Sequence, residues 1–390
     1  MGLARAGGLG ALLMLLQNVT ALKYKMTVDS DCDCYLTNGS TGTFFKTHKF
    51  YDFRSRSDLV NVPSSYASDP DAASNADVAS DYFNSDEWND GWSIQQWNNS
   101  ADLDDGDANV LMVNSPANVY FDANADPDAQ SDTYLTLRTV RLDGFQTAAE
   151  FESIAQAYHY ASARMYARAV GPPGAVAAMF TYRGSDDPNA IQEADLEIRT
   201  MDPPDVIQYT NQPAYNRQGD PVDRATRNAT VPVGWDAWAV HRMDWSPDST
   251  MWYVDGLNVS QIGFQTPRDP SSVIFNMWSD GAHWSGNMSV GDEAYLQIQW
   301  IELVYNATDD TEASDNSGSK RRGFGGGDDR DRRALLVPRD DGQCHKVCSI
   351  DDTEMLGTPV LLSGAPALVR IGSAGYWVSV LASAIVFLIF

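Results

Sequence analysis

Residues 191–200 of this chain read IQEADLEIRT. Glu193, Asp195 and Glu197 stand at every second position of a stretch that has the apolar alternation of a β-strand. Because alternate side chains of a strand point to opposite faces, the three acids share one face and the apolar residues between them face a core. Like charges at this spacing repel each other, so the pattern indicates a face with a specific use.

The segments around this stretch predict a protein built of strands. Strand-like runs separated by turn-rich segments continue from about residue 22 to residue 307, and no long segment of helical period interrupts them. The pair Asp255-Gly256 after an apolar run is a strong hairpin signal. This spacing favours an antiparallel β-sandwich. The strands are expected at residues 134–142, 158–170, 175–182, 238–245, 251–254, 273–278 and 294–305.

The composition and charge of the chain limit the kinds of molecule that it is expected to bind. The chain has 390 residues and a formal net charge of −26, with 11% aromatic residues. Nucleic-acid binding needs basic patches, so no nucleic-acid partner is expected. A strongly acidic balance also keeps an extracellular protein soluble.

The two ends predict the protein's destination. Residues 1–21 have a basic residue, an apolar run and the small residue Ala21, which is the layout of a secretory signal peptide. Residues 376–390 are apolar and follow the small residues Ser363-Gly364-Ala365 after a spacer. This predicts a glycosylphosphatidylinositol (GPI) attachment signal over residues 366–390, and a secreted protein held at the cell surface. The alternative is a single-pass tail anchor.

The segment before the anchor signal differs in composition from the domain. Residues 308–365 are predicted to be a flexible linker and tail that carries one of two cysteine pairs. The four cysteines, Cys32, Cys34, Cys344 and Cys348, should be bridged in an oxidising compartment, and three pairings are open. A bridge between the two pairs would tie the tail to the domain. Six Asn-x-Ser/Thr sequons, at Asn38, Asn98, Asn228, Asn258, Asn287 and Asn306, make glycosylation plausible.

No metal or cofactor is expected. The acidic run between Asp102 and Asp107 could in principle bind calcium, but it lacks the spacing and closing glutamate of an EF-hand. Because these acidic residues lie among Ser, Asn and Ala, they are better explained as the polar residues of loops than as a metal site.

Paired carboxylates are also the machinery of retaining glycosidases. These enzymes need a nucleophile and an acid about 5–5.5 Å apart across one glycosidic bond. Residues four apart on a strand have Cα atoms separated by roughly 13 Å, which side chains that lean together shorten. Crowding also raises at least one pKa, which keeps a proton available. Alone, however, such a motif also fits the wet face of a surface strand.

The surroundings of the motif add to this interpretation. HYASARMYARAVGPPGAVAAMFTYRGSDDPNAIQEADLEIRT (residues 159–200) resembles glycoside hydrolase family 16. Three later segments, a Thr-Asn pair at residues 210–211, HRMDWSPDSTMWYVDG (241–256) and VIFNMWSDGAHWSG with AYLQIQWIELVY (273–305), follow in the family's order. The resemblance covers roughly residues 134–305. It implies an all-β, concanavalin A-like β-jelly-roll sandwich over residues 22–307 with a glycan cleft on its concave sheet.

The resemblance also implies roles. Glu193 matches the nucleophile, Glu197 the acid/base and Asp195 the assisting carboxylate, in the unbulged form of the motif found in mixed-linkage glucanases and cell-wall transglycosylases. Ala194 departs from the family, which usually has a larger aliphatic residue there. Trp278, Trp284, Asn211 and His241 are the candidates for substrate binding, because aromatic rings stack on sugars and polar groups hold hydroxyls.

We therefore expect a retaining glycosidase acting on a polysaccharide, β-1,3- or mixed β-1,3/1,4-glucan, at a cell wall that the anchor and the resemblance suggest is fungal. The alternatives are a transglycosylase that joins glucan or chitin-glucan chains, a non-catalytic glycan-binding module on the same fold, and a structural wall protein.

Overall fold

The computed structural model describes residues 24–38, 43–64, 67–308, 344–351 and 353–362. The predicted signal peptide, the predicted anchor signal and the middle of the predicted linker lie outside these residues. Among the described residues, no helix is both long enough and apolar enough to cross a membrane.

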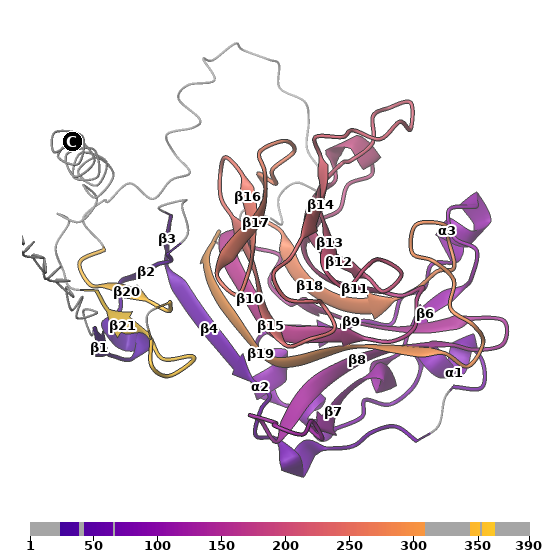
Figure 1. Ribbon diagram of the computed structural model, residues 1–390, viewed down its shortest axis with the longest axis horizontal. Helices are drawn as coiled ribbons and strands as arrows, with labels where there is room; N and C mark the ends of the chain where they lie inside the picture. The colour runs from indigo at the N-terminus through magenta and orange to yellow at the C-terminus, as the bar shows by residue number, and fades with distance from the viewer. Residues whose placement is uncertain (1–23, 39–42, 65–66, 309–343, 352, 363–390) are drawn as a thin grey trace, which may run out of the picture.

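Two antiparallel layers form the body of the protein, so the predicted all-β jelly-roll sandwich is confirmed (Figure 1). We call the layer that carries the three acids the cavity sheet and the layer behind it the back sheet. The cavity sheet contains, in spatial order, β14 (Thr226–Thr230), β13 (Val206–Gln212), β12 (Gln192–Arg199), β11 (Val176–Arg183), β18 (Ser272–Trp278), β9 (Gln146–Ser153) and β5 (Trp92–Ile94).

The back sheet is continuous with the cavity sheet through a short pairing of two strands, in which Val140 lies opposite Thr147 and Arg141 opposite Gln146. It contains β7 (Val119–Ala123), β8 (Thr133–Arg141), β19 (Glu293–Ala307), β4 (Thr47–Asp52), β10 (Tyr158–Val170), β15 (Ala239–Trp245), β16 (Thr250–Val254) and β17 (Leu257–Ile262). The short strand β6 (Met112–Asn114) runs parallel to β9.

Helices are minor in the described chain. They are α1 (Pro70–Ser74), α2 (Asp86–Asn89) and α3 (Ser100–Asp105), with single 3₁₀ turns at Asp29–Asp31, Ser57–Leu59, Asp81–Asn84, Pro116–Asn118 and Pro188–Ala190. All seven strands expected from sequence are present within one or two residues at each end. The hairpin predicted at Asp255-Gly256 joins β16 to β17, and both residues have positive φ, 48° and 78°, as this kind of turn requires.

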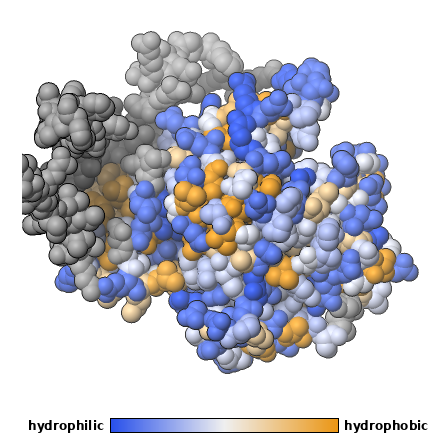
Figure 2. Space-filling view, in the orientation of Figure 1, coloured by the Kyte–Doolittle hydropathy of each residue, from blue (hydrophilic) through white to orange (hydrophobic). Residues whose placement is uncertain are grey.

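The core lies between the two layers. Leu196 and Ile198 of β12 are fully buried there against Tyr209 of the next strand and Trp252 of the back sheet. Burial of each such side chain contributes about 1.5–3 kcal/mol, so the apolar face of β12 fixes the direction of the acidic face. In the space-filling view, polar residues cover most of the face shown, and a group of apolar residues lies near its centre (Figure 2).

The two ends of the described chain form a separate small sheet. Its strands are β1 (Lys25–Met26), β21 (Val360–Leu361), β20 (Val347–Ser349), β2 (Cys34–Leu36) and β3 (Phe44–Phe45). Disulfides join Cys32 to Cys348 and Cys34 to Cys344, with Cα–Cα distances of 5.7 Å in both. The four cysteines therefore link the N-terminal pair to the C-terminal pair.

This small sheet is also held to the sandwich by charge. Asp351 Oδ1 lies 2.7 Å from Arg164 Nη1 of β10 and 3.5 Å from Arg242 Nη1 of β15, and all three side chains are buried. Residues 344–351 and 353–362, predicted from sequence to belong to a flexible tail, thus contain the strands β20 and β21 and belong to the folded unit. Two disulfides and buried ion pairs hold this segment on the sandwich, although its polar composition predicted a spacer.

The turn between β10 and β11 is a tight contact that can be tested. Gly174 has φ of +111°, and a Cβ there would lie 2.7 Å from the carbonyl carbon of Asn287 and 2.8 Å from the nitrogen of Met288. We expect Gly174→Ala to lower the free energy of unfolding by about 2 kcal/mol or more, because strain and a backbone clash add. Chemical denaturation measures the loss.

Gly219→Ala is the matched control. Gly219 also has positive φ, +81°, but nothing lies within 4 Å of its added Cβ. The free energy of unfolding of Gly219→Ala should fall by only about 1 kcal/mol, the cost of a positive φ for a residue with a Cβ. Equal losses in the two variants would contradict close packing of this turn.

Candidate active site

The three acids of β12 open into one cavity. Glu193, Asp195 and Glu197 line it, while the residues between them, Ala194 and Leu196, are fully buried on the opposite face. The prediction that the acids share one face of the strand and the apolar residues face the core is therefore confirmed.

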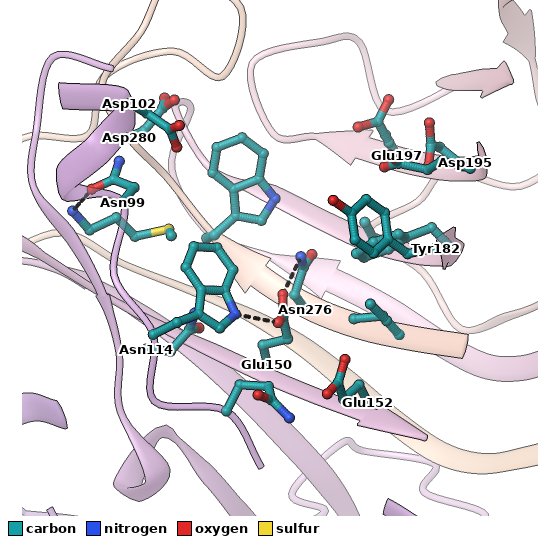
Figure 3. A pocket seen from close by; sticks show the side chains of 18 residues that line it. Asn99, Asp102, Asn114, Glu150, Glu152, Tyr182, Asp195, Glu197, Asn276 and Asp280 are labelled. Atoms are coloured by element: carbon teal, nitrogen blue, oxygen red, sulfur yellow. Dashed lines mark hydrogen bonds between the residues drawn. The ribbon is translucent and has the colours of Figure 1, made fainter. Parts of the chain in front are cut away.

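The cavity has a volume of about 550 Å³ and spans the cavity sheet from β12 to β9 (Figure 3). Carboxyl, amide and aromatic side chains dominate its lining. The lining residues are Gln95, Trp97, Asn99, Asp102, Met112, Asn114, Glu150, Glu152, Ala178, Phe180, Tyr182, Glu193, Asp195, Glu197, Ile274, Asn276, Trp278 and Asp280.

Strand register places a polar neighbour beside each acid. On β13, Gln208 lies opposite Glu197 and Thr210 opposite Asp195. Gln208 Nε2 donates a hydrogen bond to Glu197 Oε2 at 3.3 Å. The side chain of Glu197 is thus held from the β13 side.

Burial shifts the protonation of the two glutamates. It raises the pKa of Glu193 to about 7, an effect that the neighbouring Asp195 carboxyl opposes and the charge of Glu150 reinforces. It raises the pKa of Glu197 to about 8, with a further contribution from the charge of Glu193. Burial therefore keeps both glutamates protonated to a higher pH than exposed glutamates.

Asp195 sits between these glutamates and is almost fully buried. Burial first, and then the charges of Glu193 and Glu197, raise its pKa well above the ordinary range. Both carboxyl oxygens of Asp195 are buried and have no hydrogen-bond partner among the described residues, which disfavours a full charge on this side chain. At neutral pH the three acids therefore hold protons among them rather than three full charges.

The four predicted substrate-binding residues separate into two groups. Trp278 lines the cavity, and Trp284 stacks beside it with ring centroids 6.0 Å apart and an angle of 23° between the planes. Trp284 itself is not a lining residue, and the guanidinium of Arg199 lies 5.4 Å from its ring.

Asn211 and His241 lie elsewhere. Both are fully buried, and neither lines the cavity. Asn211 pairs with Ala194, so it faces the core, where its Nδ2 donates to the backbone oxygen of Phe264 at 3.0 Å. His241 belongs to β15 of the back sheet, and burial lowers its pKa to about 4. The structure thus does not bring these two residues to the predicted glycan cleft.

Sequence reasoning missed a second pair of carboxyls. Glu150 and Glu152 of β9 line the same cavity, and Figure 3 shows them on one strand. Glu150 accepts hydrogen bonds from Trp97 Nε1 at 2.7 Å and Asn276 Nδ2 at 3.1 Å, and burial raises its pKa to about 7. The alternation of apolar and acidic residues could have revealed this pair. Ala149 precedes Glu150 and Phe151 separates it from Glu152, and both apolar side chains are buried.

The raised pKa of Glu197 makes stability depend on pH. Between about pH 4.5 and 8 the folded protein keeps a proton on Glu197 that the unfolded chain has lost. The folded state then binds more protons, so the free energy of unfolding falls as pH rises. Glu197→Gln removes this penalty, and its melting temperature should exceed that of the wild type by a margin that grows over the same interval.

Each kcal/mol corresponds to about 2–4 °C in a domain of this size, so thermal melts at several pH values resolve the trend. Asp128→Asn, at an exposed carboxyl outside the cavity, reports the effect of one lost charge on the whole molecule. A stability difference that stays constant with pH would rule out a buried proton on Glu197.

Comparison with known proteins adds to this geometry. The family model described as "Glycosyl hydrolases family 16" matches residues 112–302. The chain is 26% identical over 155 residues to "Beta-glucanase" of Bacillus subtilis (strain 168), which covers 38% of the chain and 60% of that protein. It is 24% identical over 239 residues to "Beta-glucanase" of Paenibacillus polymyxa, covering 58% of the chain and 85% of that protein.

Solved structures give weaker similarities. A prokaryotic β-1,3-1,4-glucanase (lichenase) from a mouse hindgut metagenome has a TM-score of 0.45 at 16% identity, over 67% of this chain and 100% of that one. A structure described as apo Crh5 transglycosylase has a TM-score of 0.36 at 15% identity, over 49% and 85% of the two chains. The matched segment, residues 112–302, contains all the cavity carboxyls except Asp102. Over this segment the chain is similar to glycosyl hydrolases family 16.

Proposed function

We propose that the protein is a retaining glycoside hydrolase acting on β-glucan, with β-1,3 or mixed β-1,3/1,4 linkages as its substrate class. The observation that carries this proposal is the convergence of Glu193, Asp195 and Glu197 in one cavity. The names of the bacterial relatives support the choice of glucan.

The resemblance to family 16 gives the two glutamates different roles. Glu193 supplies the carboxylate that attacks the anomeric carbon while the bond to the leaving oxygen breaks. Glu197, with a pKa of about 8, still holds the proton that it gives to that oxygen. A covalent glycosyl-enzyme results.

The second half of the reaction reverses the role of Glu197. As a carboxylate, it takes a proton from the oxygen that attacks the glycosyl-enzyme, and Glu193 leaves. If the attacking oxygen belongs to water, the reaction is hydrolysis. If it belongs to a sugar hydroxyl, the same residues perform transglycosylation, which is the alternative outcome at this site.

Asp195 positions and tunes the nucleophile. It lies between the two glutamates on the same face of β12 and is held in place by its own burial. Glycan chains would lie on the aromatic residues of the cavity, since the apolar faces of pyranose rings stack on such side chains. Trp97, Tyr182 and Trp278 offer these surfaces.

The proposal extends to location. A secreted protein held at the cell surface by a GPI anchor follows from the apolar runs at residues 1–21 and 376–390. Such a protein would meet wall polysaccharide directly.

The roles of the two glutamates can be separated by rescue. Glu193→Gln should abolish turnover on every substrate, because no nucleophile remains, whereas Glu197→Ala should still attack substrates whose activated leaving groups need no proton. Azide needs no general base, so it should restore turnover by Glu197→Ala and release a β-glycosyl azide. Chromatography and NMR of the products identify it.

Asp195→Asn should be impaired less than either variant, because it does not form or break a bond with the sugar. If both glutamate variants keep wild-type activity, the acids are not catalytic. If they keep only glycan affinity and the wild type is inactive, the protein is a binding module.

Anchoring has its own measurement. We expect a phosphatidylinositol-specific phospholipase to release the protein from membranes, and the membrane-bound form to lack residues 376–390. Detection of the intact C-terminal peptide in that form by mass spectrometry would disprove the anchor.

A further inference from the structure

The described residues that line the cavity include acids but no bases. Seven of its residues are carboxylic acids, and none of the described lining residues is Arg, Lys or His. Glu193, Asp195 and Glu197 account for three of the acids and have proposed roles. The other four are Asp102, Glu150, Glu152 and Asp280.

These four acids are spread along the cavity rather than gathered. Asp102 and Asp280 lie together at the end opposite Asp195 and Glu197, while Glu152 lies on β9 (Figure 3). No group of three described His, Cys, Asp or Glu side chains is arranged to hold a metal ion. The arrangement therefore suits positive charge carried along an extended ligand better than a single ion.

Buried polar atoms in the same cavity also lack partners. Asn114 Nδ2 and Asn276 Oδ1 have no hydrogen bond from or to a described residue, although their side chains are 1% and 8% exposed and line the cavity. Such atoms cost free energy unless a ligand or water pairs with them. One is a donor and the other an acceptor, so a ligand with both kinds of group satisfies them.

Glu152 is the carboxyl most open to a new partner. No described residue makes a hydrogen bond or ion pair with its side chain, whereas Glu150 is held by Trp97 and Asn276. It stands in one row across the sheet with Asp195, through Phe180 and Ile274. Three strand spacings of about 4.8 Å place its Cα about 14 Å from that of Asp195, outside the bond-breaking centre but inside the cavity.

We propose that the cavity accepts β-glycans containing glucosamine, and that the ammonium of one such residue pairs with Glu152. This proposal rests on the glycosidase function proposed above and specifies its substrate class. An ammonium supplies the counter-charge that the cavity lacks, and its N–H groups and the sugar hydroxyls match the unpaired amide oxygen of Asn276.

The same charges select against other polysaccharides. A uronate or a sulfated sugar would add negative charge to a partly enclosed site whose ionisable lining residues, among those described, are all carboxylic acids. Repulsion in a low-dielectric cavity is stronger than in water. A neutral glucan fits, but it leaves Glu152 without a cation.

A pair of β-1,4-linked hexasaccharides tests this. The hexamer of glucosamine and the hexamer of glucose differ by an ammonium in place of a hydroxyl on each ring, so they isolate the charge. Affinities are measured by calorimetry at several pH values between about 5 and 7, because burial raises the pKa of Glu152 and the ion pair needs its carboxylate. The full-length protein carries Glu193→Gln throughout, which prevents turnover.

We expect the glucosamine hexamer to bind about fivefold tighter or more, as one ion pair provides. Adding Glu152→Gln should remove the preference, whereas adding Asp128→Asn, which removes an exposed charge outside the cavity, should leave it intact. Equal affinities for the two hexamers would overturn the proposal. So would a preference that survives Glu152→Gln, because it would reflect only the acidity of the whole protein.

A parallel assay keeps the two proposals apart. The wild-type protein is incubated with neutral mixed-linkage glucan, and the new reducing ends are measured. Release of sugar together with equal hexamer affinities leaves the glycosidase and removes only the amino-sugar proposal. No release together with a preference that depends on Glu152 removes the glycosidase and keeps the binding specificity.

Discussion

The structure depends on how one strand keeps three carboxyls together in a cavity that none of the described Arg, Lys or His side chains lines. Glu193, Asp195 and Glu197 would repel each other strongly if all were ionised, and desolvation adds to that cost. The chain meets the constraint with protons, since burial raises the pKa of all three. Their charge state is therefore a property of the group, and it provides the acid and the latent carboxylate that cleavage of a glycoside needs.

That arrangement is supported from behind. Ala194 is smaller than the aliphatic residue that the family resemblance led us to expect, yet it is fully buried between Thr181 of β11 and Asn211 of β13. Asn211 then reaches across the interior to the backbone after β17, where it donates to the oxygen of Phe264. A small residue on β12 and an amide on β13 thus share the space behind the acids and tie the two layers together.

Periodicity explains why the fold could be predicted from the sequence. The expected strands alternate apolar and polar residues, and burial of the apolar face decides their position. The tail could not be assigned in this way, because β20 and β21 are too short to show a period and are held by two disulfides and the contact of Asp351 with Arg164. These interactions join residues more than 180 positions apart, and local composition carries no trace of them.

The same limit governs the site. Glu193, Asp195 and Glu197 could be found because one strand carries them all, but Glu150 reaches the cavity from β9, two strands away from the neighbour of β12. Asn211 shows the opposite error, in which a polar residue beside the motif is assigned to the cleft although strand register turns it inward.

The pairing register of the strands shows which side chains near the acidic motif face the cavity and which face the core. A residue paired directly opposite a cavity acid shares the face of that acid, so Gln208 and Thr210 of β13 point toward the cavity side and Asn211 toward the core. The rule continues across the sheet: Ala178, Asn276 and Glu150 follow from Glu197 in one row. All three line the cavity, so the row that starts at the proposed acid/base defines the floor on which a glycan chain would lie.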